Sequence, residues 1–127
     1  MKPEDRVARW LDDLISTLDQ ASELVERGRH TFDSDPAIAL AFEALSNRVG
    51  DLAKRLVVAD ESRFADPIWR QAARNRDFVV HHYDRVDADL LWNTVTESFP
   101  RLAEIVRNAV TDADSPRRGG MGEPDQD

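Results

Sequence analysis

The chain has 127 residues, of which 41% are hydrophobic and 33% are charged, a composition typical of one folded helical domain and not of a disordered chain. It contains no cysteine, which excludes disulfides and thiolate metal sites. The formal net charge of −8 argues against a general nucleic-acid coat protein, because such a protein binds by broad neutralisation of phosphates.

Along the chain, the first helix is predicted from about residue 7 to residue 25, where apolar residues recur at i, i+3, i+4 and i+7. Gly28 is the expected stop, and His30 to Asp35 read as a polar connection. The pair Asp35-Pro36 then combines a capping residue with proline at the first helical position, and predicts a second helix to about Val58.

The same start signal at Asp66-Pro67 predicts a third helix, and Asp87 is the expected cap of a fourth. Pro100 should kink that helix or force a restart, because proline lacks a backbone donor. Apolar spacing ends near Val110, so residues 111–127 are expected to form a disordered acidic tail. The fold class is therefore all-α, an antiparallel bundle of four or five helices over residues 1–110.

The segment R-D-F-V-V-H-H-Y, residues 76–83, concentrates chemistry on the third helix. An arginine can neutralise phosphate, a histidine can take and return a proton near neutral pH, and a tyrosine offers a hydroxyl that can be modified. Together these side chains favour phosphodiester chemistry without a metal. A loose cluster of Glu23, Glu26 and His30 does not form a convincing metal set, and we expect no cofactor.

Helix geometry tests this constellation. At about 100° per residue, Arg76 and His81 point roughly 140° apart, whereas Arg74 and His81 share a face. Either the helix loosens near His81, or a second copy completes the site across a two-fold axis. RNA cleavage by its own 2′-hydroxyl would need a base, an acid and a cation, which histidine and arginine supply. The alternative is a solvated or capping role at a helix end.

Longer stretches carry a family resemblance. R-N-R-D-F-V-V-H-H-Y-D-R-V-D (74–87) resembles the signature of HepT-type toxins, in the HEPN superfamily of small helical ribonucleases. V-G-D-L-A-K-R-L (49–56), P-I-W-R-Q-A-A-R (67–74) and D-L-L-W-N-T-V (89–95) are similar to the family's flanking helices. Asp77 stands where asparagine is commoner, and Asp51 where glutamate is usual. The resemblance covers about residues 5–110.

The resemblance implies a homodimer whose motif helices face each other, acting as the metal-independent endoribonuclease toxin of a type VII-like toxin–antitoxin system. The implied antitoxin is a small nucleotidyltransferase that uses ATP and magnesium and adenylylates Tyr83. The substrate is RNA, with tRNA and mRNA both open. The alternative is a helical protein that only docks to a nucleotidyltransferase without cleaving RNA, and a second is a structural dimer in which the motif merely packs.

Residue roles follow from the same resemblance. Arg76 and His81 are the expected catalytic pair, with Arg74 as auxiliary phosphate contact or as the main arginine instead. Asp77 and Asp51 are expected to orient that pair, and His82 fills a variable position beside it. Trp10, Trp69 and Trp92 are expected in the core or the dimer interface and not as platforms for base stacking.

No apolar run is long enough to span a bilayer and no secretion signal opens the chain, so we expect a cytoplasmic protein.

Overall fold

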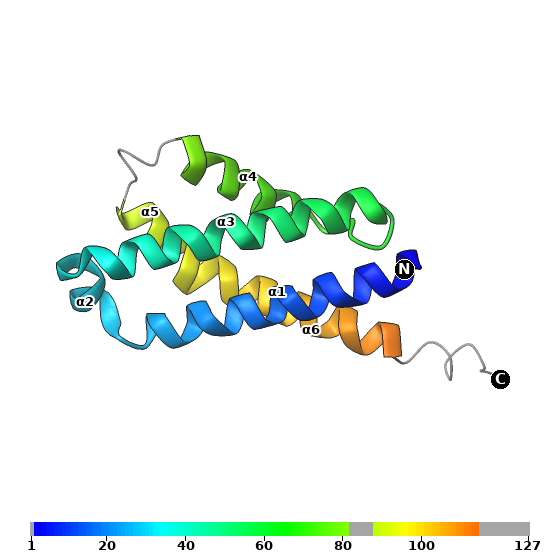
Figure 1. The fold of residues 1–127 in the computed structure, drawn as a ribbon, viewed down its shortest axis with the longest axis horizontal. Coiled ribbons are helices and arrows are strands. Elements are labelled where there is room, and N and C mark those ends of the chain that lie inside the picture. The colour runs from blue at the N-terminus through cyan, green and yellow to red at the C-terminus, as the bar shows by residue number, and fades with distance from the viewer. Residues whose placement is uncertain (1, 82–87, 115–127) are drawn as a thin grey trace.

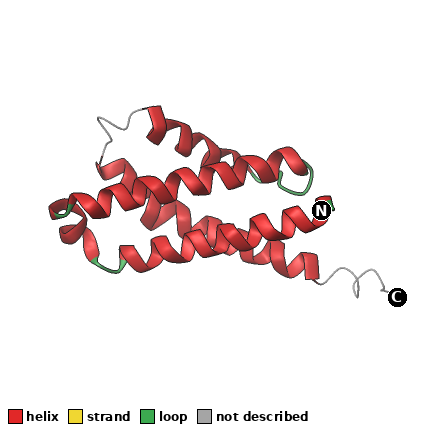
Figure 2. Cartoon of the chain, viewed as in Figure 1, coloured by secondary structure: helices red, strands yellow, loops and turns green. Residues whose placement is uncertain are grey.

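The computed structural model describes residues 2–81 and 88–114, with side chains for residues 2–74 and 88–111. Every regular element in these ranges is helical (Figure 2). In chain order they are α1 (Pro3–Val25), α2 (Gly28–Ser34), α3 (Pro36–Ala59), α4 (Pro67–His81), α5 (Ala88–Asn93), a π-helical turn (Thr94–Ser98) and α6 (Phe99–Asp114). The predicted all-α class is confirmed. The homodimer stays a prediction.

The long helices form an antiparallel bundle around α3, which lies between α4 and α1 (Figure 1). The most extensive contact joins α3 to α4, followed by those of α1 with α3 and with α6. The start of α1, the α3–α4 connection and the end of α6 lie at one end of the bundle, and α2 lies at the other (Figure 1).

The core is a single cluster in which each long helix buries one stripe, as the apolar spacing predicts. On α1 the buried residues recur every three or four positions. The largest side chains that are almost fully enclosed are Trp69, Phe42, Phe64, Leu11, Leu14, Leu56 and Leu102.

Two helix starts follow from the aspartate–proline pairs. An Asp35 side-chain oxygen accepts a hydrogen bond from the backbone N–H of Ala37 at 3.0 Å, and Asp66 does the same for Ile68 at 3.0 Å. Each cap satisfies a donor that the first helical turn leaves free, and the following proline has no donor to satisfy. The predicted starts of α3 and α4 are confirmed.

The polar connection expected at residues 30–35 is wrong, because residues 28–34 form the short helix α2. Gly28 links α1 to α2 with a φ of 89°, in the left-handed region that favours glycine. Phe32 holds α2 in place and is only 4% exposed. Its ring centroid lies 5.7 Å from that of Phe42 and 5.3 Å from that of Trp92.

The irregularity expected at Pro100 is present as the π-helical turn, in which the N–H of Phe99 donates to the carbonyl of Thr94. A wider turn accommodates a proline that could neither donate a helical hydrogen bond nor fit against the preceding carbonyl. Beyond it, α6 continues to Asp114, so the expected disorder is wrong for residues 111–114. Residues 115–127 lie outside the described ranges. No helix of the described ranges combines the length and apolarity needed to cross a membrane.

Candidate functional site

The helix that carries the motif is anchored at its first half. Ile68, Trp69 and Ala72 are buried, and the Trp69 ring meets that of Phe64 edge-on with centroids 4.9 Å apart. With the Asp66 cap, these contacts fix the direction of α4 against α3. They therefore place the backbone of the second half of α4, which continues through residue 81.

Most of the predicted site falls in this second half or just after it. Arg76, Asp77 and His81 belong to α4 by backbone, but their side chains lie outside the described residues. His82 and Tyr83 lie outside the described residues altogether. The predicted pairing of Arg76 with His81 therefore stays a prediction.

Arg74 and Asp51 are the predicted site residues whose side chains are described. Arg74 is exposed on α4, and Asp51 is half-buried on α3. Because α3 and α4 run antiparallel from one connection, a rise of about 1.5 Å per residue places Asp51 about 12 Å from the end of α3 and Arg76 about 13 Å from the start of α4. Asp51 thus lies at the level of the motif along the bundle, as its expected orienting role requires.

Two polar residues of α3 lie farther from the α3–α4 connection, at the level of the end of α4. Ser46 is 3% exposed, and among the described side chains its Oγ has no hydrogen-bond partner, nor has Oδ1 of the half-buried Asn47. By the same helical rise, Ser46 and the backbone of His81 both lie about 20 Å from the α3–α4 connection. A buried hydroxyl without a partner is uncommon in folded proteins, so this part of α3 differs from an ordinary core helix.

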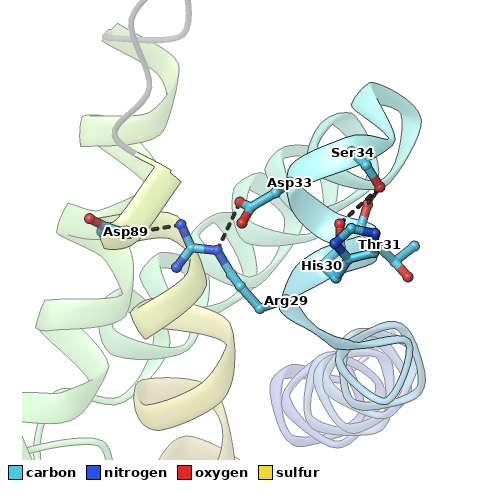
Figure 3. Close-up of polar contacts among 6 residues, drawn as sticks. All are labelled: Arg29, His30, Thr31, Asp33, Ser34 and Asp89. Carbon is cyan, nitrogen blue, oxygen red and sulfur yellow. Dashed lines mark hydrogen bonds and ion pairs between the residues drawn. The ribbon is translucent and has the colours of Figure 1, made fainter.

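Arg29, which the sequence analysis did not identify, anchors α5, the helix that follows the motif. Arg29 donates from Nε to Asp33 and from Nη2 to Asp89, each at 2.8 Å, and so ties α2 to the first turn of α5 (Figure 3). Its guanidinium also lies over the ring of Phe32, 5.5 Å from the centroid. The hydrogen bonds to Asp33 and then to Asp89 raise the pKa of the Arg29 guanidinium. The i,i+4 spacing of Arg29 and Asp33 is a sequence pattern from which their ion pair could have been predicted. No such pattern links Arg29 to Asp89.

A groove of about 660 Å³ runs between α1 and α3 and includes Asp51. One stripe from each helix lines it at i, i+3, i+4 and i+7 spacing. The lining residues are Pro3, Glu4, Arg6, Val7 and Trp10 from α1, Asp51, Lys54, Arg55, Val58 and Ala59 from α3, and Asp60 and Arg63 beyond it. Nothing in the sequence alone paired these two stripes.

A metal-binding cluster of three or more histidine, aspartate or glutamate side chains is not found among the residues that the structure describes. Those residues exclude His81 and His82, so the predicted independence from metal stays a prediction.

Comparison with known proteins bears on the motif helix directly. The sequence profile of the family described as "Ribonuclease HepT-like" matches residues 14–109, which span α3, α4 and most of α1 and α6. The chain belongs to the HepT-like ribonuclease family. The resemblance found in the motif and its flanking helices is thereby confirmed.

Individual relatives of this HepT-like chain agree with that assignment. The protein named "Putative RNase TTE0752" from Caldanaerobacter subterraneus subsp. tengcongensis is 26% identical over 94 residues, covering 71% of this chain and 84% of the relative. The protein named "Probable ribonuclease HepT" from Thermococcus cleftensis is 50% identical over 34 residues, covering 27% of this chain and 31% of that relative. No solved structure gives a significant match to the chain.

Proposed function

We propose that this HepT-like chain is the toxin of a type VII-like toxin–antitoxin system and cleaves RNA without a metal, using Arg76 and His81. The observation that carries the proposal is the motif R-D-F-V-V-H-H-Y, of which residues 76–81 lie on α4, in a chain of a ribonuclease family. Asp51, at the level of Arg76 along the bundle, supports it.

In the proposed reaction, the ribose 2′-oxygen attacks the neighbouring phosphorus while an imidazole removes its proton. The bond from phosphorus to the 5′-oxygen breaks, and a second acid returns a proton to that leaving oxygen. The products are a 2′,3′-cyclic phosphate and a 5′-hydroxyl. Arg76, with Arg74 as an auxiliary contact, stabilises the charge that develops on the phosphoryl oxygens. Only RNA carries the nucleophile, which accounts for the substrate class.

A homodimer would supply both proton-transfer groups. Arg76 and His81 diverge by roughly 140° on one regular helix, so one chain does not bring them together. Two copies related by a two-fold axis would present two imidazoles to one cleft, and each arginine could act with the partner's histidine. Asp77 and Asp51 would then orient the cations, and His82 would lie beside the pair.

Adenylylation of Tyr83 would provide the off state. The phenol oxygen attacks the α-phosphorus of ATP, pyrophosphate leaves, and the tyrosine carries AMP. The added phosphate places bulk and negative charge next to cations that must receive RNA, so substrate is repelled. The enzyme proposed to modify Tyr83 is a nucleotidyltransferase antitoxin, which uses ATP and magnesium. The toxin itself needs no cofactor.

His81→Ala tests the catalytic assignment. We expect the variant to lose RNA cleavage, a loss of at least about 100-fold, because general acid–base catalysis contributes on that order. The matched controls are His82→Ala, next in sequence, and His30→Ala, exposed on α2, and both should cleave RNA at close to the wild-type rate. Cleavage that survives His81→Ala would contradict the catalytic assignment of His81. No cleavage by any form of the protein would favour the non-catalytic docking partner instead.

Tyr83→Phe tests the regulation. The variant should still cleave RNA, because the phenol takes no part in the reaction, but it should escape neutralisation when the nucleotidyltransferase is co-expressed. Intact-mass spectrometry should find AMP on the wild type and none on the variant. A variant that gains AMP all the same would move the modification to another residue.

A further inference from the structure

The groove between α1 and α3 differs from the rest of the surface in its charge. Four cationic side chains line it, Arg6, Lys54, Arg55 and Arg63, against three carboxylates, Glu4, Asp51 and Asp60. The local balance is therefore positive in a chain whose formal net charge is −8. An anion approaching this groove therefore meets a locally favourable surface on a chain that is negative as a whole.

These cations are available to a ligand. Across the described ranges, Arg6, Lys54 and Arg55 make no ion pair or side-chain hydrogen bond. Arg63 donates one hydrogen bond from Nη2 to the carbonyl of Ala109, at 3.1 Å, and its guanidinium lies 5.1 Å from the ring centroid of Phe64. Its other donors make no hydrogen bond to a described residue, and the two contacts hold the side chain in place, which lowers the entropy lost on binding.

The floor of the groove is apolar and carries an aromatic ring. Trp10 is half-buried against the core and lines the groove with Val7, Ala59 and Val58, the last 76% exposed. Trp10 was expected in the core or the dimer interface; it packs against the core and also lines this groove. A flat indole flanked by unpaired cations is the combination that single-stranded nucleic acids use, with bases stacked on the ring and phosphates on the cations.

The groove also reaches the level of the motif, so an RNA bound in it could extend to the cleavage site. It extends from Asp51, at the level of the motif, to Arg63 at the end of the bundle. Its volume of about 660 Å³ falls within the range of small-molecule sites and suits a short stretch of nucleotides.

We infer that the α1–α3 groove binds single-stranded RNA outside the cleavage site, with a base stacked on Trp10 and phosphates on Lys54, Arg55, Arg6 and Arg63. This inference rests on the proposed function and adds a substrate-holding surface to it. The groove then contributes to affinity and to the choice of RNA, while the motif performs the chemistry.

The test measures binding of a fluorescein-labelled 2′-O-methyl hexa-adenylate, which has no free 2′-hydroxyl and is not cleaved. Lys54→Gln combined with Arg55→Gln should reduce the slope of log Kd against log salt concentration by about 1.4, and weaken binding roughly 25-fold at 0.1 M salt, because each phosphate contact on a single strand contributes about 0.7 to that slope. The matched control is Arg27→Gln with Arg101→Gln, which removes the same charge from exposed positions outside the groove. The control should leave the slope close to that of the wild type.

A second variant examines the ring. Trp10→Leu keeps an apolar side chain on the core side and should weaken binding about fivefold or more through lost stacking. The wild type should also show tryptophan fluorescence quenching on binding, and Trp10→Leu should lose most of it. Melting curves of both variants confirm that they are folded.

Three results would overturn the inference: equal losses in the two double variants, no loss in either, or a change in sedimentation of Trp10→Leu without a change in RNA affinity. The last would make the groove a contact between protein chains. Cleavage of unmodified RNA, measured in parallel, separates this failure from that of the proposed function. If the wild type cleaves RNA while the groove variants bind RNA normally, this inference fails and the proposed function stands. If the wild type binds RNA in the groove without cleaving it, the proposed function fails and the groove remains a binding site.

Discussion

The two halves of the α3–α4 pair are built differently. Near the α3–α4 connection the contact is apolar, with Leu56 of α3 and Phe64 beside Trp69 of α4. Farther along, α3 carries the buried Ser46, which has no hydrogen-bond partner among the described side chains and lies at the level of the end of α4. The partly enclosed Glu43 lies one turn beyond it. The first half stabilises the fold, and the second accepts polar groups at a cost in stability. Such local departures from good packing are expected where a protein carries its function.

The largest effect expected from this division is the loss of Trp69. Trp69→Ala should lower the free energy of unfolding by about 3–5 kcal/mol, because it empties a core position that is 2% exposed. That is a large share of the roughly 5–15 kcal/mol typical of a domain, so RNA cleavage should fall with the folded fraction. Urea unfolding followed by circular dichroism measures it. The exposed neighbour Arg70→Ala should cost at most about 1 kcal/mol, and a similar loss in both variants would contradict the division.

A smaller effect is expected at the cap of α4. Asp66→Ala should cost about 1 kcal/mol, because the N–H of Ile68 loses its acceptor. Asp35→Ala removes the equivalent bond from α3 and should cost about the same, while Asp66→Asn should retain most of the stability. Thermal unfolding of the three variants compares them. Cleavage lost in Asp66→Ala without a loss of stability would show that the first half of α4 also serves the chemistry.

The smallest effect concerns Glu43, in the polar half of α3. Partial burial raises the pKa of its carboxyl group. A raised pKa in the folded state means that folding binds a proton, so stability falls as pH rises from the usual glutamate pKa to the raised one and then levels off. Glu43→Gln should therefore increase the melting temperature slightly at pH 8, with a smaller gain at about pH 3.5, below the usual value of about 4.3. Glu104→Gln, at an exposed position of α6, is the control and should show no such difference; an equal gain at both pH values would contradict the assignment.

Local signals accounted for much of the fold. The starts of α3 and α4 follow from an aspartate and a proline that act within one helical turn, and the irregularity before α6 follows from the missing N–H of Pro100. The helix α2 was missed because Phe32 secures it against Phe42 and Trp92, residues that come later in the chain. A polar sequence read alone offers no sign of such contacts.

The candidate site divides in the same way. The motif at residues 76–83 and its family can be recognised in the sequence, because the residues that define the motif are contiguous in the chain. Asp51 was identified from resemblance, and its level beside Arg76 follows from the antiparallel packing of α3 and α4. The bond from Arg29 to Asp89 spans 60 positions, and no local pattern encodes it.

By itself, then, the sequence determined where α3 and α4 begin, which face of each long helix is apolar, and which family of ribonucleases the chain joins. These properties depend on neighbours within a few turns. Tertiary structure alone decided that the stripe around Trp10 on α1 faces the stripe around Lys54 on α3, since two helices acquire a common groove only when a core brings them together.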